Sequence, residues 1–220
     1  MPLFPRNLQT IRQRISDAAR KAERNPNSIK LVAVSKAKDE ADIRAALDAG
    51  HKVFGENRVQ EAQAKYPALR AAHPDLKLHM IGSLQTNKAE DAVQLFDVIE
   101  TLDRPRLAAA LSEAIKKTGR NPECYIEVNI GGELQKSGIA PEMLGDFLGF
   151  CRDSCGLNVT GLMALPPQHA DPMPFFQQMK QLADTHKLPH LSLGMSGDFE
   201  AAIACGATEV RIGTALFGPR

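Results

Sequence analysis

The sequence predicts an α/β protein, a single (β/α)8 barrel of the TIM type preceded by one extra helix. Short apolar runs alternate with helical patterns along the chain, an order that implies parallel strands joined by helices. Eight such runs can be counted, the number that closes this kind of barrel. No linker rich in Pro, Gly or Ser divides the 220 residues, so a single domain over residues 1–220 is expected.

The extra helix comes first. From Asn7 to about Glu23, apolar residues recur at helical spacing and basic residues occupy the other faces. A basic face can bind nucleic acid, but because no aromatic residues are interleaved with it, a solvated face is favoured. The segment Asn25-Pro26-Asn27 breaks the pattern. Residues 1–25 are therefore expected to form an N-terminal helix packed on the barrel.

The predicted strands follow in order, each a short apolar run, and most lead through a turn into a helical pattern. They are Ile29–Lys36, Lys52–Glu56, Leu78–Gly82, Asp97–Leu102, Cys124–Ile130, Val159–Leu165, Leu191–Met195 and Val210–Phe217. The clearest helical patterns between them are Glu40–Ala49, Arg104–Lys117, Pro141–Cys151, Met173–His186 and Asp198–Cys205. An open doubly wound sheet is the alternative fold. It would carry a glycine-rich fingerprint after its first strand, and this chain has none there.

The charge balance excludes several classes of partner. A net charge of +1, from 27 basic and 26 acidic residues, gives no general attraction for nucleic acid or an anionic membrane. The N-terminal residues contain no apolar signal segment and no later stretch is apolar enough to span a membrane, so a soluble cytoplasmic protein is expected.

The cysteines and histidines do not predict a metal site. The histidines lack metal-ligand spacing and the cysteines lack a C-x-x-C pair. We therefore expect no bound metal, and free thiols in a reducing compartment. The four cysteines are Cys124, Cys151, Cys155 and Cys205.

The first predicted strand ends in a lysine. Alternation along the strand puts Val32, Val34 and Lys36 on one face. If that face is the packed interior, the amine of Lys36 lies at the rim of an apolar space, which is the setting of a Schiff-base lysine. The alternative is a solvated lysine that only marks the end of a strand.

Two further strand ends carry polar groups. In a barrel, functional residues lie at the end where the strands have their C-termini, which we call the mouth. Asn57 follows the second predicted strand and could either cap the next helix or reach into the mouth. His79 lies on the third, where a lone histidine is more often a core residue than a catalyst.

The last two strands end in glycines and hydroxyl groups. Ser196 and Gly197 open a predicted helix whose free N–H groups suit an anion. Gly213 and Thr214 end the eighth strand. The loops after strands seven and eight are where phosphate sites recur in this fold.

Arg211 precedes this second glycine and shares its face of the strand. It either projects into the barrel or forms an ion pair with Glu209. A strand-end lysine, an anion cradle and an inward arginine together fit an aldehyde cofactor that bears a phosphate. Pyridoxal 5'-phosphate has these groups.

Six segments carry a resemblance to a known family. They are Val32-Ala33-Val34-Ser35-Lys36, Gly55-Glu56-Asn57-Arg58-Val59-Gln60-Glu61, residues 79–88, Val128-Asn129-Ile130 with Lys136-Ser137-Gly138, Gly161-Leu162-Met163-Ala164, and residues 191–218. Taken in this order, over nearly the whole chain, they resemble the pyridoxal phosphate homeostasis protein family. The resemblance implies an alanine racemase-like barrel without that enzyme's second domain, which binds pyridoxal phosphate and has no established reaction.

The resemblance also implies a role for each matching residue. Lys36 matches the lysine that forms the internal aldimine, and Arg211 the arginine facing the pyridine nitrogen. Asn57 falls in a motif that lines the mouth. The phosphate-binding segment is matched by Ser196, Gly197, Gly213 and Thr214. Departures from the family pattern occur at Leu78, Ser83 and Gly197, where an aromatic residue, His or Pro, and an acidic residue respectively are common.

The function expected from this resemblance is that of a cofactor carrier. Such a protein holds pyridoxal phosphate as a lysine aldimine and contributes to intracellular vitamin B6 homeostasis, by buffering the cofactor or delivering it to apo-enzymes. The alternatives are a pyridoxal-phosphate-dependent amino-acid racemase and a Schiff-base aldolase without cofactor. No catalytic residue is assigned. Because the racemase's second domain is not in this sequence, a monomer is expected.

Racemisation on this fold needs an acid/base on each face of the substrate carbon, the second of which is a tyrosine in the racemases. The chain has two tyrosines. Tyr66 lies past the end of a helix that starts at the mouth, so it is expected near the opposite end of the barrel. Tyr125 begins the fifth strand and is expected at that end too. Neither is expected to reach the cofactor.

Overall fold

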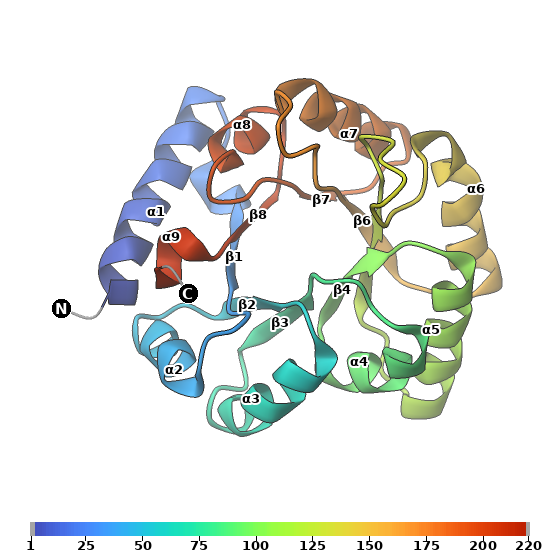
Figure 1. Ribbon diagram of the computed structural model, residues 1–220, viewed down its shortest axis with the longest axis horizontal. Helices are drawn as coiled ribbons and strands as arrows, with labels where there is room; N and C mark the ends of the chain where they lie inside the picture. The colour runs from blue at the N-terminus through green and yellow to red at the C-terminus, as the bar shows by residue number, and fades with distance from the viewer. Residues whose placement is uncertain (1–2, 219–220) are drawn as a thin grey trace.

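The computed structural model describes residues 3–218, which form a closed barrel of parallel strands (Figure 1). Each strand pairs with the next, and the last pairs with the first. The strands are β1 (Lys30–Val34), β2 (Val53–Glu56), β3 (Lys77–Met80), β4 (Val98–Leu102), β5 (Glu123–Glu127), β6 (Val159–Met163), β7 (His190–Ser192) and β8 (Glu209–Ile212). The predicted barrel is confirmed, while residues 1–2 and 219–220 of the predicted domain lie outside the described part.

Helices surround the barrel on its outer side (Figure 1). They are α1 (Leu3–Lys21), α2 (Glu40–Asp48), α3 (Val59–Ala72), α4 (Ala89–Leu95), α5 (Pro105–Thr118), α6 (Leu144–Gly149), α7 (Met173–Thr185), α8 (Phe199–Ala204) and α9 (Thr214–Phe217). Short 3-10 turns occupy Pro26–Ser28, Thr86–Lys88 and Pro141–Met143, and a π-helical segment, Phe150–Ser154, extends α6.

The N-terminal helix is confirmed as α1. Its apolar stripe is buried, and the helix lies beside α8 and α9 at the point where the ring of helices closes (Figure 1). It begins at Leu3, one turn before the predicted start, because Phe4 continues the apolar stripe and is buried. The buried residues of the stripe are Phe4, Leu8, Ile11, Ile15 and Ala19.

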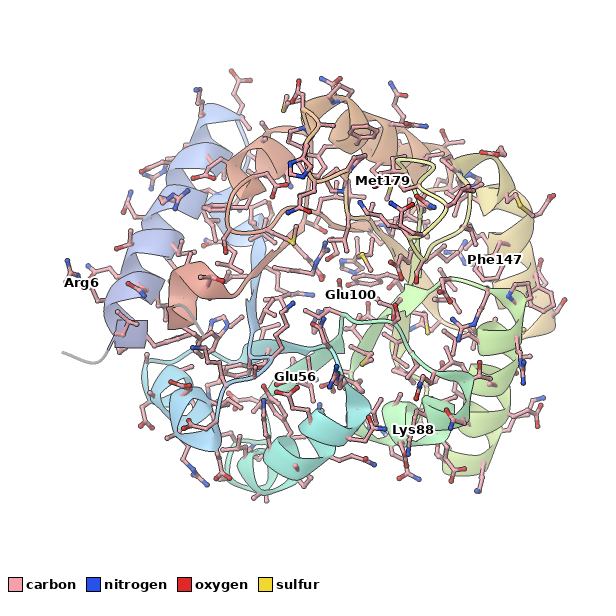
Figure 2. The ribbon with its side chains drawn as sticks, in the orientation of Figure 1. Arg6, Glu56, Lys88, Glu100, Phe147 and Met179 are labelled. Carbon is pink, nitrogen blue, oxygen red and sulfur yellow. The ribbon has the colours of Figure 1, made fainter. Side chains whose placement is uncertain are left out.

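The strands separate two environments. Leu31 and Ala33 face the helices and belong to the main apolar core, whereas Val32 is buried inside the barrel, where a Cβ on Gly55 would touch it. The valine face of β1 is therefore the interior. The interior also holds charged groups, and Figure 2 shows Glu100 in the middle of the ring.

Several predicted strands run past their observed ends, β5 and β7 by three residues each. β1 stops at Val34, so Lys36 lies in the turn beyond the strand. β8 stops at Ile212, and the last part of the predicted strand forms α9 instead. Gly213 precedes α9, at the point where the chain changes from strand to helix.

The cysteines are free, as predicted. Burial raises the pKa of the Cys124 thiol, and likewise that of Cys151, to about 12, which makes both unreactive. Within residues 3–218, every helix falls short of the length and apolar character needed to cross a bilayer.

Candidate functional site

The predicted site residues gather at the mouth. The strands β7, β8, β1 and β2 are consecutive neighbours around the barrel. Lys36 follows β1 and Asn57 follows β2. The segments 196–197 and 213–214 follow β7 and β8, and Arg211 lies within β8. The fold thus brings all seven predicted residues to one side of the same end of the barrel.

Lys36 is half-buried in its turn, and its amine makes no hydrogen bond or ion pair with any described residue. The next residue, Ala37, has a positive φ of 58°, which is costly for a residue with a side chain. A hydrogen bond of 2.6 Å from the Ala37 amide to Glu61 Oε1 holds this backbone in place. The turn therefore presents an unpaired amine on a fixed backbone.

The residue before Lys36 anchors the turn from the other side of the strand. Ser35 is buried and donates to Glu56 Oε1 at 2.8 Å, so its one proton is used and the hydroxyl of Tyr66, 2.7 Å away, donates to Ser35. Lys65 bonds the Ser35 carbonyl and Glu56, each at 3.1 Å. Burial raises the pKa of Glu56, while Ser35 and Lys65 oppose the rise.

The position of Tyr66 corrects the sequence prediction. It lies inside α3, not past its end, and its hydroxyl reaches the level of the mouth. The bonded Ser35 faces the helices, so this hydroxyl is on the opposite face of the sheet from Lys36. The prediction failed because Pro67 suggested the end of a helix, although α3 continues through it to Ala72.

The segment after β7 is a tight loop. Gly194 has a φ of 85°, and a Cβ there would lie 2.8 Å from Phe199 Cα, so only glycine fits. Asp198 Oδ1 accepts a 2.6 Å bond from the Met195 amide. Ser196 and Gly197 lie in this loop, just before α8 begins at Phe199. The Ser196 hydroxyl has no partner among residues 3–218.

The segment after β8 packs against the end of β1. A Cβ on Gly213 would lie 3.3 Å from the Cβ and carbonyl oxygen of Val34, a tight approach that favours glycine. The backbone of Gly213 therefore lies close to the strand end that leads to Lys36. Thr214 begins α9, is exposed, and its hydroxyl bonds to no other described residue.

Arg211 points into the barrel. Its Nη1 donates to the carbonyl oxygen of Ser192 at 2.8 Å and to its Oγ at 2.5 Å, and Nη2 donates to the Ala164 carbonyl at 3.1 Å. The nearest carboxylate is Glu100, whose Oε2 lies 3.7 Å from Nη1. The alternative ion pair with Glu209 is wrong, because Glu209 pairs with Lys30 at 2.7 Å.

Glu100 is a buried carboxyl group close to Arg211. It is fully buried, which favours its neutral form, but hydrogen bonds from His79 Nδ1 and Ser192 Oγ, both 2.6 Å, and the Arg211 charge hold the pKa of this carboxyl below its usual range. His79 is thus a core residue with a partner, as the sequence favoured. The hydroxyl of Tyr125 donates to Glu209 Oε1 at 2.7 Å, at the end of the barrel away from the mouth, as predicted.

A cluster of possible metal ligands lies in this interior. Ligand atoms of His79, Glu100 and Glu209 lie within 4.8 Å of one another. The two carboxylates are already balanced by two cations, Lys30 and Arg211. The cluster is therefore accounted for as an ion-pair network, and we assign no metal to it.

Asn57 is not a helix cap. The residue at the start of α3 is Arg58, whose side chain makes no capping bond. The Asn57 side chain is half-buried and bonds to no described residue, while its backbone packs so closely on Gly82 that a Cβ there would lie 2.4 Å from the Asn57 oxygen. Of the two alternatives, the capping role is wrong and the mouth position remains.

Sequence reasoning missed Glu127. This residue ends β5, is 8% exposed, and its Oε2 has no hydrogen-bond partner among the described residues. Burial and the charge of Asp103 raise the pKa of Glu127 to about 7, while Arg211 and Arg104 oppose the rise. Alternation along the strand could have placed it in the interior, but its unpaired state depends on tertiary packing.

Two cavities flank the barrel. One of about 520 Å³ lies beside the loop after β7 and is lined by Lys136, Pro167, Met195 and Gly197 among others. A larger one of about 650 Å³ opens at the opposite end, around His79. The mouth is the stronger candidate site, because the unpaired amine and hydroxyls gather there.

Comparison with known proteins places the chain in a family. The family model for the alanine racemase N-terminal domain matches residues 6–220. A pyridoxal phosphate homeostasis protein of Aquifex aeolicus is 41% identical over 222 residues, covering 97% of this chain and 96% of the relative.

Two solved structures of PipY from Synechococcus elongatus are also similar. The one without pyridoxal phosphate has a TM-score of 0.87 and 36% identity, covering 98% of this chain and 100% of that one. The one with pyridoxal phosphate bound has a TM-score of 0.78 and 38% identity, covering 93% and 100%. The chain therefore belongs to the alanine racemase N-terminal domain family and, within it, to the pyridoxal phosphate homeostasis proteins.

Proposed function

We propose that this protein binds pyridoxal 5'-phosphate at the mouth of the barrel, holds it as an aldimine of Lys36, and releases it to other proteins. The observation that carries the proposal is the unpaired Lys36 amine on a fixed turn, beside two loops with unpaired hydroxyls. The names of its relatives, and the related structure with pyridoxal phosphate bound, support it.

The residues at the mouth fit the groups of this cofactor. The cofactor supplies an aldehyde, with which the amine of Lys36 can condense. Its phosphate fits the exposed loops after β7 and β8, where unpaired hydroxyl and backbone N–H groups are available as donors. The residues assigned to the phosphate are Ser196, Gly197, Gly213 and Thr214, and Asn57 is assigned to the rim of the mouth.

Arg211 suits the pyridine nitrogen. Its Nε–H makes no hydrogen bond to a described residue, so the guanidinium keeps a free donor after binding Ser192 and Ala164. A guanidinium does not give up its proton, so a ring nitrogen opposite it stays unprotonated. An unprotonated ring withdraws electrons weakly, which favours storage of the cofactor over its use in catalysis.

The positions of the two tyrosines support a carrier role. Racemisation would require a second acid/base beside Lys36. Tyr66 has its hydroxyl on the other face of the sheet and Tyr125 lies at the other end of the barrel. We therefore assign the protein to intracellular vitamin B6 homeostasis, in which it buffers the cofactor or delivers it to apo-enzymes.

The proposed aldimine between Lys36 and the cofactor is tested by reducing the loaded protein with borohydride and mapping the labelled peptide. A pyridoxyl group on Lys36 is expected, with no stoichiometric label in Lys36→Ala. Lys136→Ala is the matched control, because Lys136 also lies near the mouth but is paired with Glu133. A label found mainly on Lys38 or Lys136 would contradict the assignment.

Delivery is tested separately. The loaded protein is mixed with an apo-enzyme that requires pyridoxal phosphate, and recovery of activity is followed with and without a scavenger of free cofactor. Recovery that survives the scavenger indicates direct transfer, and recovery that the scavenger abolishes indicates buffering. No recovery in either case would contradict the carrier role.

A further inference from the structure

The strand β5 carries an interior carboxyl group that the proposed site does not yet use. Ile126 and Val128 belong to the outer apolar core, so Glu127, between them, faces the barrel interior. Tyr125 shares this face and lies two residues nearer the opposite end. Glu127 is therefore at the mouth end of the interior, with 8% of its surface exposed.

The described residues leave one oxygen of this carboxyl without a partner. Glu127 Oε2 is shielded from solvent and has no hydrogen-bond partner among residues 3–218. The charged groups that face it are Asp103 after β4, Arg104 at the start of α5 and Arg211 on β8, and none of them bonds to it. A buried polar group without a partner is unfavourable, so a ligand that pairs with it is favoured.

The protonation state of the Glu127 carboxyl determines whether it can donate a hydrogen bond to a ligand atom. Burial first, and then Asp103, raise the pKa of Glu127 to about 7, against the opposing effect of the two arginines. Near neutral pH a large share of the molecules therefore carries a proton on Glu127. A protonated carboxyl donates a hydrogen bond, whereas an ionised one would repel an anionic ligand.

The proposed cofactor leaves one polar atom unassigned. Under the proposed function, Lys36 takes its aldehyde, the loops after β7 and β8 its phosphate and Arg211 its ring nitrogen. The remaining polar group of the ring is the phenolic oxygen, which is an acceptor. β5 stands across the ring of strands from β1, so Glu127 faces the side of the site that these other residues leave open (Figure 1).

We propose that Glu127 is a cofactor-binding residue that donates a hydrogen bond from its protonated carboxyl to the phenolic oxygen of bound pyridoxal phosphate. The inference rests on the proposed function and adds a pH dependence to it. Loss of the proton removes the donor and places a negative charge beside an anionic ligand. Affinity for the cofactor should therefore fall as pH rises through 7.

The test is a titration of the apo-protein with pyridoxal phosphate between pH 6 and 8, read by absorbance. Glu127→Gln keeps a donor that cannot ionise, and Glu127→Leu removes it. Because pH also acts on the cofactor itself, the readout is the ratio of wild-type to Gln-variant affinity. For one group with a pKa of about 7, this ratio should fall about tenfold from pH 6 to pH 8. The Leu variant should bind weakly throughout.

Glu123→Gln is the matched control, because Glu123 lies on the same strand at the opposite end and bonds to Thr160. It should follow the wild type at every pH. Melting curves of all variants establish that each is folded. Pyridoxal, which lacks the phosphate, should show the same change in ratio, and a change that vanishes with pyridoxal would place the contact on the phosphate and overturn the proposal.

Failure of this inference is distinguishable from failure of the proposed function. Equal pH dependence in the wild type and Glu127→Gln, with the borohydride label still on Lys36, would show that Glu127 does not meet the cofactor while the site stands. Absence of the label from Lys36 in the wild type would overturn the site itself, and this inference with it.

Discussion

Ser35 and Lys36, the two residues after β1, differ in their surroundings. Ser35 faces the helices and belongs to a buried hydrogen-bonded cluster with Glu56 and Tyr66, whereas the amine of Lys36 has no partner among the described residues. Figure 2 shows Glu56 between the ring of strands and α3. Because the backbone is fixed through Ser35, the amine next to it can stay free without the turn becoming mobile.

Removal of the Tyr66 hydroxyl should therefore affect stability and not the site. Tyr66→Phe deletes one buried hydrogen bond while Ser35 keeps Glu56 as a partner, so a loss of about 1 kcal/mol in the free energy of unfolding is expected. Urea denaturation measures this loss, and borohydride labelling of Lys36 should be unchanged. A folded Tyr66→Phe protein that no longer labels would place Tyr66 in the site.

Glu127 should make stability fall with pH even without the cofactor. Its pKa rises from 4.5 to about 7 on folding, so between these values the folded state holds a proton that the unfolded state has lost. Ionisation of Glu127 should therefore lower the stability of the wild type, relative to a variant that cannot ionise there, by up to about 3 kcal/mol between pH 4.5 and 7.

The Gln variant isolates this contribution. Glu127→Gln cannot ionise, so its stability relative to the wild type should increase over the same window, as measured by urea unfolding at pH 4.5, 6 and 8. Glu123→Gln, whose side chain is 41% exposed, should follow the pH profile of the wild type. Parallel pH profiles for the wild type and Glu127→Gln would show that the carboxyl is not perturbed as described.

Arg211 should control the spectrum of the bound cofactor. Arg211→Gln removes the permanent cation opposite the ring nitrogen and leaves Glu100 without its nearby arginine charge. We expect weaker retention of pyridoxal phosphate and a shifted absorbance band, measured on equal amounts of folded protein. Unchanged affinity and spectrum would reduce Arg211 to a structural role in the barrel core.

At the scale of elements, the sequence predicted most accurately the helices whose apolar residues recur with a regular helical period. Helices α2, α5 and α7 lie within two residues of their predicted bounds, since their apolar stripes are regular. The helices α3 and α4 were not among the clear patterns, because α3 contains Pro67 and α4 is only 7 residues long. A short or interrupted stripe gives too few repeats to be recognised.

The candidate site, too, could be predicted from the sequence only in part. Parallel strands bring their ends together, so residues at strand ends could be placed at the mouth from sequence. The partners of Arg211 could not, because Ser192 and Ala164 come from other strands and meet it only through the closure of the barrel. Glu127 was missed for a related reason, as its lack of a partner is a property of the packed interior.

The N-terminal helix should contribute to the stability of the whole barrel. Ile11 is 2% exposed on the buried stripe of α1, and Ile11→Ala removes buried methyl groups and leaves a cavity. A loss of about 2–5 kcal/mol in the free energy of unfolding is expected. Gln9→Ala, at an exposed position of the same helix, is the control and should change it by less than about 0.5 kcal/mol. A small effect at Ile11 would mean that α1 is not part of the cooperative unit.

At the scale of the whole molecule, the barrel keeps its charged groups at two levels. At the end away from the mouth, Glu209 Oε1 pairs with Lys30 and Tyr125, while its Oε2 has no hydrogen-bond partner among the described residues. At the mouth, Glu127 Oε2 and the Lys36 amine also lack partners among these residues. An amine and a carboxyl group left without partners at the mouth are the arrangement that the proposed binding site uses.

This arrangement predicts binding without racemisation. The loaded protein should not interconvert the enantiomers of alanine or other amino acids at a steady rate, because neither tyrosine hydroxyl shares the mouth with Lys36. Loss of one positioned acid/base typically lowers a rate by about 10²- to 10⁴-fold. Chiral chromatography of amino acids incubated with the loaded protein measures the rate, with Lys36→Ala as the blank.

Glu127 provides a further test of this prediction, because a titratable group at the mouth with a pKa of about 7 is a candidate for the second acid/base. Its carboxyl would be able to exchange a proton with a substrate carbon only if it reached the face opposite Lys36. We expect Glu127 instead to donate a hydrogen bond to the phenolic oxygen of the cofactor, where it takes no part in proton transfer to or from a substrate. Steady racemisation that is abolished by both Lys36→Ala and Glu127→Gln would contradict the carrier assignment and identify Glu127 as the second acid/base.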